Sequence, residues 1–428
     1  MTKEKSTVPR LRFPGFTDAW KQRKLGEVAD FSIKTNSLSR DKLSSYFYEV
    51  QNIHYGDILT KYDAILDVCN KELPSIIGST ISDFADDLLI EGDIVFADAA
   101  EDSTVGKAIE VRNFKGKNVV SGLHTIVARP KVSYAPYYLG YLINSTAYHN
   151  QILPLMQGTK VSSISKANLK STTIVFPTLP EQEAIGSFFS DLDQLITLHQ
   201  RKLDDVKELK KALLQKMFPK GNGNDFPELR FPEFKDAWKQ RKLREVATFV
   251  KGNGYSKKDL VIEGSPIILY GRLYTKYETV ISEVDTFVSV EDNKNSVVYS
   301  EGGEVLVPAS GESSLDIARA SVVAKKGIIL GGDINIIRLH SEIFPVFLAL
   351  TISNGKQQKG LSKRAQGKSV VHLHNSDLKK VDLDFPTLPE QEAIGNFFSD
   401  LDQLITLHQR QLDHLKLLKK ALLQQMFI

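Results

Sequence analysis

Two long stretches of the chain repeat the same helical pattern of apolar and polar positions. In residues 178–218, apolar side chains recur at alternating steps of four and three, and residues 387–428 repeat that spacing. Thr178 suits a helix start, because its hydroxyl can cap the first turn while Glu181 bonds back. Each stretch would extend about 60 Å as a helix. The pattern therefore predicts two long helices that pair through their apolar seams as an antiparallel coiled coil.

Polar residues interrupt the two predicted seams at the same two places. These residues are His199 and Lys210 in the first helix and His408 and Lys419 in the second. We interpret the histidines as residues that set the register rather than as metal ligands, because a polar seam residue commonly has that effect. Pairing within the chain is our preferred arrangement, and pairing between two chains is the alternative. The apolar seam residues are Ile185, Phe189, Leu192, Ile196, Leu203, Leu213, Ile394, Phe398, Leu401, Ile405, Leu412 and Leu422.

The duplication extends beyond these helices. The segment Pro9–Phe31 returns as Pro227–Phe249 with 18 of 23 positions identical, and residues 178–218 return as 387–427 with 35 of 41 identical. Segments that stay alike in both copies are expected to make the same contact twice. Segments that differ are expected to contact different partners. Uneven drift after a recent duplication is the alternative interpretation.

Two divergent inserts separate the repeated blocks. Their β-branched and aromatic runs predict strands, and their longer apolar runs that open with proline predict helices. We expect strands at residues 88–97, 119–129, 305–309 and 328–339, and helices at 136–151 and 345–358. The expected fold class is α+β: two globular domains joined by two long antiparallel helices, with a pseudo-two-fold internal duplication. The expected divisions are 1–177 for the first globular domain, 178–218 for the first helix, 219–226 for a linker, 227–386 for the second globular domain and 387–428 for the second helix.

Composition narrows the class of protein without assigning a function. The chain has 428 residues, 42% hydrophobic and 25% charged, which is ordinary for a folded protein of about two to three domains. The single cysteine, Cys69, excludes an intrachain disulfide and suits a reducing compartment. No run reaches the roughly 18 apolar residues of a membrane span, and the first ten residues lack the apolar stretch of a signal peptide. We therefore expect a cytoplasmic protein without a membrane contact.

The distribution of charge is more informative than the net charge of +3. The windows Lys131–Pro180 and Gly355–Ser376 contain lysines but no acidic residue, and each precedes or reaches a predicted long helix. Basic stretches of this kind suit contacts with the phosphate oxygens of DNA. A solvated basic surface is the alternative. Arg272 could in addition engage guanine in the major groove.

Motifs for catalysis are missing from the sequence. The Asn/Asp-Pro-Pro-Tyr/Phe tetrapeptide of amino-methyltransferases does not occur, and the P-loop-like ending at Gly367-Lys368-Ser369 has Ser362 where its first glycine should stand. One cysteine cannot supply a Cys/His metal site, and no nucleophile elbow accompanies the histidines. The sequence therefore predicts a non-catalytic protein with no metal site.

The ordered set of motifs resembles the specificity subunits of type I restriction-modification systems over nearly the whole chain. The resemblance rests on the duplicated FPTLPEQEAIG helices and on the two divergent inserts between repeated blocks. Three segments are also similar to that family's target-recognition domains: Glu91–Ala108 (EGDIVFADAAEDSTVGKA), Ser121–Pro130 (SGLHTIVARP) and Gly331–His340 (GGDINIIRLH).

The resemblance implies a role in DNA recognition. Each globular domain would be a target-recognition domain that reads one half of a bipartite, asymmetric site in double-stranded DNA, and the helices with their seam residues would set the spacer and dock subunits. The implied partners are two modification subunits, which methylate adenine with S-adenosylmethionine, and restriction subunits, which use ATP and Mg. This chain would carry no cofactor. Three rivals remain: a coiled-coil scaffold that binds two proteins, a nuclease with an unrecognised site, and an orphan specificity subunit that redirects modification subunits encoded elsewhere.

Candidate DNA contacts come from residue type, because no invariant motif marks the base-reading positions of this family. Basic residues suit phosphates and guanine, and carboxylates can accept from the amino group of cytosine. The candidates are Lys61, Glu101, Lys107, His124, Gln157 and Lys160 in the first half, and Arg272, Lys276, Glu312, Arg319, Asn335, Gln366 and Lys368 in the second.

Overall fold

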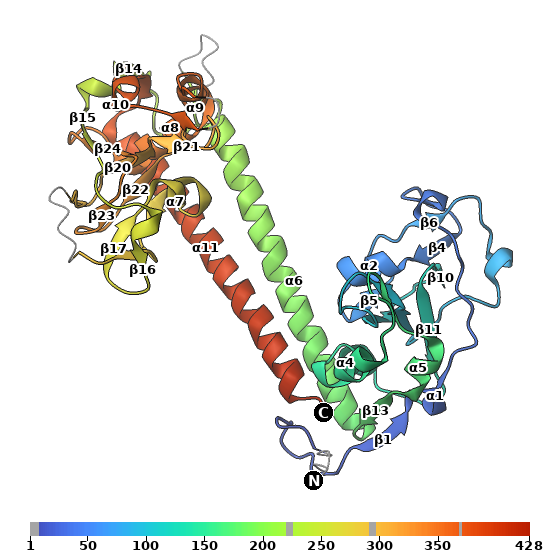
Figure 1. The fold of residues 1–428 in the computed structure, drawn as a ribbon. Coiled ribbons are helices and arrows are strands. Elements are labelled where there is room, and N and C mark those ends of the chain that lie inside the picture. The colour runs from blue at the N-terminus through green and yellow to red at the C-terminus, as the bar shows by residue number, and fades with distance from the viewer. Residues whose placement is uncertain (1–7, 220–225, 291–296, 368–369) are drawn as a thin grey trace. The chain divides into compact units, whose positions relative to one another are not determined.

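The chain forms two compact units (Figure 1). The first unit comprises Met1–His199 and Gln411–Ile428, and the second comprises Gln200–Arg410. Each unit therefore contains one globular domain together with the beginning of one long helix and the end of the other. The computed structural model describes residues 8–219, 226–290, 297–367 and 370–428.

The two long helices are α6 (Leu179–Lys216) and α11 (Leu388–Gln425). In the first unit, Phe189 of α6 packs with Phe427, which follows α11. In the second unit, Phe398 of α11 packs with Phe218, which follows α6. Because the early turns of one helix meet the end of the other, the pairing is antiparallel in both units. The predicted fold class, with paired long helices in one duplicated chain, is confirmed.

Every apolar seam residue named from the sequence is buried or half-buried. The lysines that interrupt the seam reach across to the partner helix. Lys210 of α6 forms an ion pair with Asp402 of α11 in the second unit, and Lys419 of α11 lies 2.5 Å from Asp193 of α6 in the first. The two ion pairs use the same two positions of the repeat in exchanged roles, so they specify one register twice.

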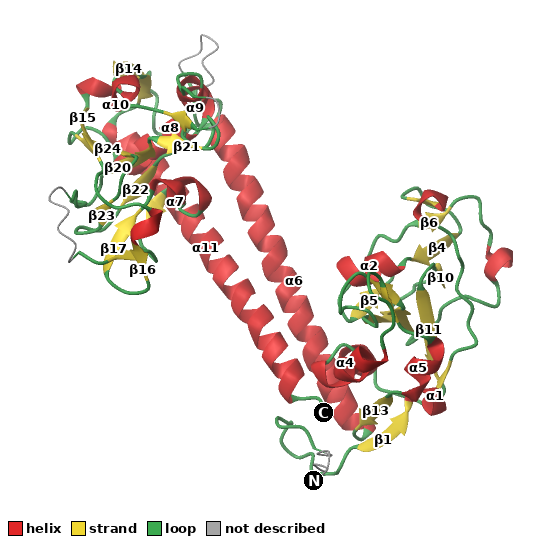
Figure 2. Ribbon diagram, viewed as in Figure 1, coloured by secondary structure: helices red, strands yellow, loops and turns green. Residues whose placement is uncertain are grey.

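The globular domain of the first unit is built on a five-stranded and a four-stranded sheet (Figure 2). The five-stranded sheet has the order β2 (Ala29–Asp30), β11 (Thr125–Pro130), β7 (Ile94–Ala97), β9 (Ala108–Arg112), β5 (Ile65–Asp67). The four-stranded sheet has the order β10 (Asn118–Ser121), β4 (Val50–Ile53), β6 (Ser75–Ile76), β3 (Leu43–Ser44). Two short ladders pair β1 (Lys21–Lys24) with β13 (Thr173–Phe176) and β8 (Ala99–Ala100) with β12 (Ser162–Ser163). The shorter helices are α1 (Leu25–Val28), α2 (Tyr55–Thr60), α3 (Tyr138–Ile143), α4 (Thr146–Ile152) and α5 (Lys166–Ser171).

The globular domain of the second unit repeats this topology strand for strand. Its five-stranded sheet has the order β15 (Ala247–Lys251), β24 (Ile334–Leu339), β20 (Val305–Pro308), β22 (Ser321–Val323), β18 (Val280–Ile281). Its four-stranded sheet has the order β23 (Ile329–Leu330), β17 (Ser265–Ile268), β19 (Phe287–Val288), β16 (Leu260–Val261). The ladders pair β14 (Lys239–Lys242) with β26 (Asp382–Phe385) and β21 (Ser310–Gly311) with β25 (Val371–His372). The shorter helices are α7 (Tyr270–Thr275), α8 (Pro345–Ser353), α9 (Gly355–Ser362) and α10 (Asn375–Leu378).

Several elements predicted as continuous are broken in the structure. The expected strand at 119–129 divides into β10 and β11, and the one at 328–339 into β23 and β24, because His124 and Asp333 adopt left-handed backbone angles (φ 54° and 58°) between them. The expected helix at 136–151 divides into α3 and α4 and begins only after Tyr137, whose φ is 71°. Apolar runs alone did not reveal these sharp turns.

The repeated blocks join each domain to the helices by the same contacts. Arg12 binds both carboxylate oxygens of buried Glu181 at 2.6 and 2.7 Å, and Arg230 binds Glu390 at the same two distances. The carboxylate of Glu181 raises the pKa of the Arg12 guanidinium through its hydrogen bond. Such bidentate pairs fix direction as well as distance, so both domains meet their helices in one geometry.

The two tryptophans pack where a helix ends. Trp20 lies edge-on to Phe427 beyond α11, and Trp238 lies edge-on to Phe218 beyond α6. Both indoles are buried, so they act as packing anchors at these junctions.

Candidate nucleic-acid interface

Both domains contain the same short ladder, in which one strand is buried and the other reaches the surface. In the first, Ala99 and Ala100 of β8 face Ser163 and Ser162 of β12. In the second, β21 and β25 pair in the same way. The turn before the ladder requires glycine: Gly158 (φ 110°) and Gly367 (φ 133°) would each place a Cβ atom 2.0 Å from a carbonyl oxygen. The exposed Gln157 and Gln366 precede these glycines, so their side chains stand beside a fixed turn.

Next to each ladder lies a residue with a left-handed backbone, and here the side chains differ. The carbonyl of His124 accepts from the N–H of Asp98 at 3.0 Å, and the carbonyl of Asp333 accepts from the N–H of Ala309 at 2.8 Å. The backbone is thus the same in both units. The first unit presents a histidine and a carboxylate there, whereas the second presents a carboxylate and a methyl group.

An aromatic and acidic group surrounds His124 in the first unit. Its Nδ1 lies 3.3 Å from Asp98, and its ring stands edge-on to Tyr55, with centroids 5.3 Å apart. Burial raises the pKa of Asp98, while the neighbouring His124 opposes this rise. Glu101 follows the ladder as an exposed residue, and Lys160 is exposed beyond the glycine turn. The predicted residues Glu101, His124, Gln157 and Lys160 therefore gather around one ladder.

The corresponding surface of the second unit carries serine and histidine. Ser310 lies 2.9 Å from Nδ1 of His372 across the ladder, and Glu312 is exposed in the loop that follows. The predicted residues Glu312 and Gln366 flank this ladder as Glu101 and Gln157 flank the first. Lys368 lies outside the described residues.

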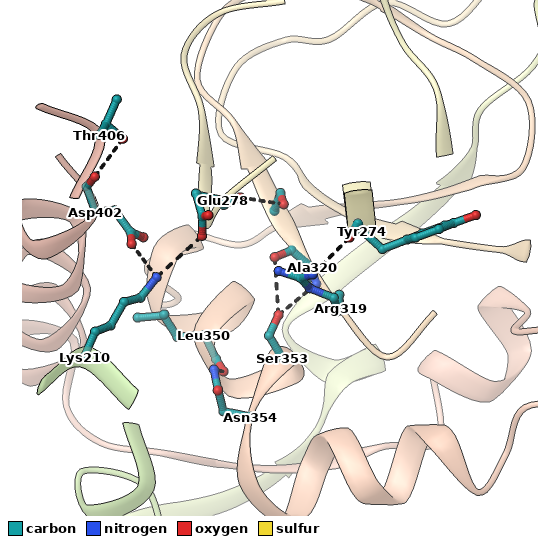
Figure 3. A network of polar contacts seen from close by, with 11 residues as sticks. Lys210, Tyr274, Glu278, Arg319, Ala320, Leu350, Ser353, Asn354, Asp402 and Thr406 are labelled. Atoms are coloured by element: carbon teal, nitrogen blue, oxygen red, sulfur yellow. Dashed lines mark hydrogen bonds and ion pairs between the residues drawn. The ribbon is translucent and has the colours of Figure 1, made fainter. Parts of the chain in front are cut away.

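Two predicted DNA contacts bind the protein's own backbone instead. Nζ of Lys107 donates to the carbonyls of Leu59 and Tyr62 at 3.2 and 2.7 Å, and burial lowers its pKa. Arg319, at the corresponding place in the second unit, donates to the carbonyl of Tyr274 at 3.1 Å (Figure 3). Both cations neutralise the carbonyl end of the short helix α2 or α7, where a positive charge is favoured. We therefore reassign them as residues that position these helices.

Asn335 is a second correction. Its side chain is buried at 1% exposure, and its amide donates to the carbonyl of Leu373 at 2.8 Å. The residue type suggested a base contact, but Asn335 lies on β24, an inner strand of the five-stranded sheet, and its amide is buried in the domain.

The cations at the ends of α2 and α7 are exposed and already paired. Lys61 lies 2.9 Å from Asp57, and Lys276 forms an ion pair with Asp285, to which Arg272 also donates at 3.0 Å. Burial raises the pKa of Asp57, but the hydrogen bonds from Arg40 and Lys61 outweigh it, so the net shift is downward. Arg272 and Lys276 could exchange Asp285 for a phosphate without leaving a buried charge, because Asp285 is half exposed. Asp57 is fully buried, so it would keep Arg40 as its ion-pair partner if Lys61 turned to a phosphate.

Sequence reasoning missed one part of this surface. Arg40, Lys61 and Lys117 line a cavity of about 600 Å³ with Phe47, whose side chain is 77% exposed, and Tyr46 beside it is 81% exposed. The adjacent aromatic pair Tyr46-Phe47 is the signal available in the sequence, because neighbouring apolar side chains that share an exposed surface often mark a binding site. That these aromatic residues lie near Lys61 and Lys117 depends on tertiary contacts, which the sequence does not display.

No group of three or more metal-binding side chains occurs within the described ranges. In the same part of the chain, none of the helices is both long and apolar enough to cross a membrane.

Comparison with known proteins identifies similar chains of similar length. The family model described as "Type I restriction modification DNA specificity domain" matches twice, at residues 17–208 and 235–417. The putative type I restriction enzyme MjaX specificity subunit of Methanocaldococcus jannaschii is 24% identical over 422 residues, covering 94% of this chain and 92% of that protein. The MjaVIII specificity subunit of the same organism is 22% identical over 278 residues, 62% of this chain and 64% of its own.

A solved structure shares the fold. The type I restriction-modification S subunit from M. genitalium superposes with a TM-score of 0.62 at 15% identity, covering 98% of this chain and 99% of the other.

Proposed function

This chain belongs to the family of type I restriction-modification DNA specificity domains, and we propose that its two globular domains read the two halves of a bipartite, asymmetric site in double-stranded DNA. It is a DNA sequence-recognition subunit of that kind of system. The observation that carries the bipartite reading is the pair of surface ladders, which share one backbone and differ in their side chains. Because the two ladders have the same backbone but different polar side chains, each is suited to recognise a different base sequence.

The proposed base-reading residues are those that surround the ladders. In the first unit these are Glu101, His124 and Gln157, and in the second they are Glu312 and Gln366. Carboxylates, amides and imidazoles can distinguish base pairs in the major groove by about 1–3 kcal/mol for each good contact. The proposed phosphate contacts, which hold the domain on DNA without reading it, are Lys61, Lys160, Arg272, Lys276 and Lys368.

We propose further that the repeated helices dock two identical modification subunits. Apolar residues stand in solvent at matching places on both helices: Leu195 and Leu198 on α6 are 41% and 46% exposed, and Leu404 and Leu407 on α11 are 38% and 50% exposed. Paired exposed leucines favour burial against a partner. The modification subunits would supply S-adenosylmethionine chemistry, and restriction subunits would supply ATP- and Mg-dependent cutting in the bacterial cytosol. This chain itself would be non-catalytic.

The test is methylation-sensitive long-read sequencing of the host genome with the gene intact and deleted. Loss of one bipartite adenine-methylation motif on deletion is the expected result, and it would give the target and spacer together. Replacing residues 238–386 by the corresponding domain of a relative should then change one half of the motif only. A change in both halves would contradict the division of labour between the domains. A genome in which the deletion alters no motif, although the modification subunits are expressed, would contradict the DNA-recognition role and favour a protein-binding scaffold.

A further inference from the structure

An open groove of about 770 Å³ in the second unit is rich in lysine. One wall is the C-terminal part of α6, which supplies Lys207 and Lys211, and the other is the first half of α9, which supplies Lys356 and Lys359. Figure 1 shows α9 beside this end of α6. The groove therefore joins a repeated helix to an element of the divergent domain.

Three of the groove lysines have charges that the protein does not neutralise. Lys356 is paired with Asp384. By contrast, Lys207, Lys211 and Lys359 are exposed, and no carboxylate of the described ranges forms an ion pair with them. The start of α9 at Gly355 adds the positive end of a helix dipole to the same space. The groove therefore favours an anion along its length.

This concentration of charge belongs to one unit only. The two copies align at a constant offset of 209 residues from α3 and α8 onward, so Ala147 and Asn150 stand in the first unit where Lys356 and Lys359 stand in the second. Two identical partner subunits would need matching surfaces on both copies. A groove present in one copy therefore does not belong to a surface that two identical partners would share.

The groove is continuous with the candidate interface of the second unit. Ser362 at the end of α9 donates to Ser314 at 3.0 Å, and Ser314 belongs to the loop that carries Glu312. From α9 the chain runs directly to Gln366 and the glycine turn. We propose that this groove binds the phosphodiester backbone of DNA beside the half-site read by the second domain, and this inference rests on the function proposed above.

The test compares salt dependence between matched variants of the full chain assembled with its modification subunits. The probe is a DNA duplex that carries the motif found by genome sequencing. Each lost phosphate contact reduces the slope of log K against log salt by about 0.9, so Lys211→Gln with Lys359→Gln should reduce it by about 1.8. The methylated motif should not change, because phosphate contacts carry no sequence information. Lys420→Gln is the matched control, since Lys420 stands on α11 where Lys211 stands on α6, and the first unit has Asn150 in place of Lys359.

The outcomes separate this inference from the proposed function. An unchanged slope in the double variant overturns the groove as a DNA site, as does an equal loss in Lys420→Gln. An unchanged slope together with weaker assembly of the modification subunits would assign the groove to an acidic protein surface instead. Failure of the unmodified assembly to bind any duplex preferentially would refute the DNA-recognition function itself.

Discussion

The two units place the same ion pair between the helices in different surroundings. In the first unit, Lys419 binds Asp193 at 2.5 Å, and the hydroxyl of Tyr141 donates to the other carboxylate oxygen at 2.7 Å. In the second unit, Lys210 binds Asp402, and the further partner is Glu278, whose carboxylate lies 3.7 Å from the lysine (Figure 3).

The difference arises in the divergent domains rather than in the repeated helices. Leu350 occupies the place of Tyr141 at the offset of 209 residues, so the second domain has no hydroxyl to offer. The second oxygen of Asp402 is buried without a hydrogen-bond partner among the described residues. Glu278, by contrast, is 56% exposed. Besides the contacts that both units share, the first domain therefore adds a buried hydrogen bond at this ion pair, and the second adds a solvent-exposed charge.

Truncating the aromatic residues at the helix junctions should have the largest effect, and it should be similar in both units. Phe189 and Phe398 are fully buried at corresponding positions. Each Phe→Ala change should cost about 3–5 kcal/mol of unfolding free energy, because it leaves a cavity in a packed core. Urea unfolding can be followed unit by unit, since Trp20 and Trp238 are the two tryptophans and lie in different units.

The exposed Leu198 and Leu407 on the same helices provide the control for this comparison. Their replacement by alanine should change stability by no more than about 0.5 kcal/mol. Equal losses for the exposed leucines and the buried phenylalanines would contradict the assignment of the seams.

Removing the seam lysines should destabilise the two units by different amounts. Lys210→Met would leave Asp402 buried with no hydrogen bond to its carboxylate and should cost about 2–3 kcal/mol. Lys419→Met should cost about 1–2 kcal/mol, because Tyr141 still donates to Asp193. Thermal unfolding in Trp20→Phe and Trp238→Phe backgrounds would report each unit, and Lys211→Met serves as an exposed-lysine control. A larger loss for Lys419→Met would reverse the proposed asymmetry.

The sequence was sufficient to predict the repeated helices, but it did not reveal side-chain positions that depend on tertiary contacts. The heptad pattern located both helices and their seams, and it marked positions 210 and 419 as polar interruptions before their partners were known. Residue type did not reveal that Lys107 and Arg319 donate to carbonyls at helix ends or that Asn335 is buried, because the sequence does not display these contacts. Their contacts join residues 38 to 48 positions apart, and no local period encodes such separations.

The turns at His124 and Asp333 escaped prediction for a related reason. A left-handed backbone at a histidine or an aspartate costs energy that surrounding strands must outweigh. The strand pairs β10–β4 and β7–β11 hold the chain on either side of His124, and the sequence pattern does not reveal strand pairing over such separations.

Alkaline pH should weaken the first unit through Tyr141. Burial, reinforced by Asp193, raises the pKa of Tyr141 above its usual range. The folded state therefore favours the neutral phenol, so its contribution is complete below the ordinary tyrosine pKa of about 10 and is lost as the pH rises above that value. Tyr141→Phe should cost about 1 kcal/mol near neutral pH and reduce the alkaline loss reported by Trp20. Tyr46→Phe, at an 81% exposed position, should alter neither quantity.

The smallest effect should come from Glu278→Gln in the second unit. A partly exposed charge 3.7 Å from Lys210 contributes about 0–1 kcal/mol, and added salt screens it. The loss should therefore be measurable at low salt and should vanish at about 1 M salt, where the screening length falls to about 3 Å. Tyr141→Phe should cost the same at both salt concentrations, because its buried hydrogen bond is shielded from ions. If both variants showed the same salt dependence, the two attachments would be equivalent, and the difference between phenol and carboxylate would have no energetic consequence.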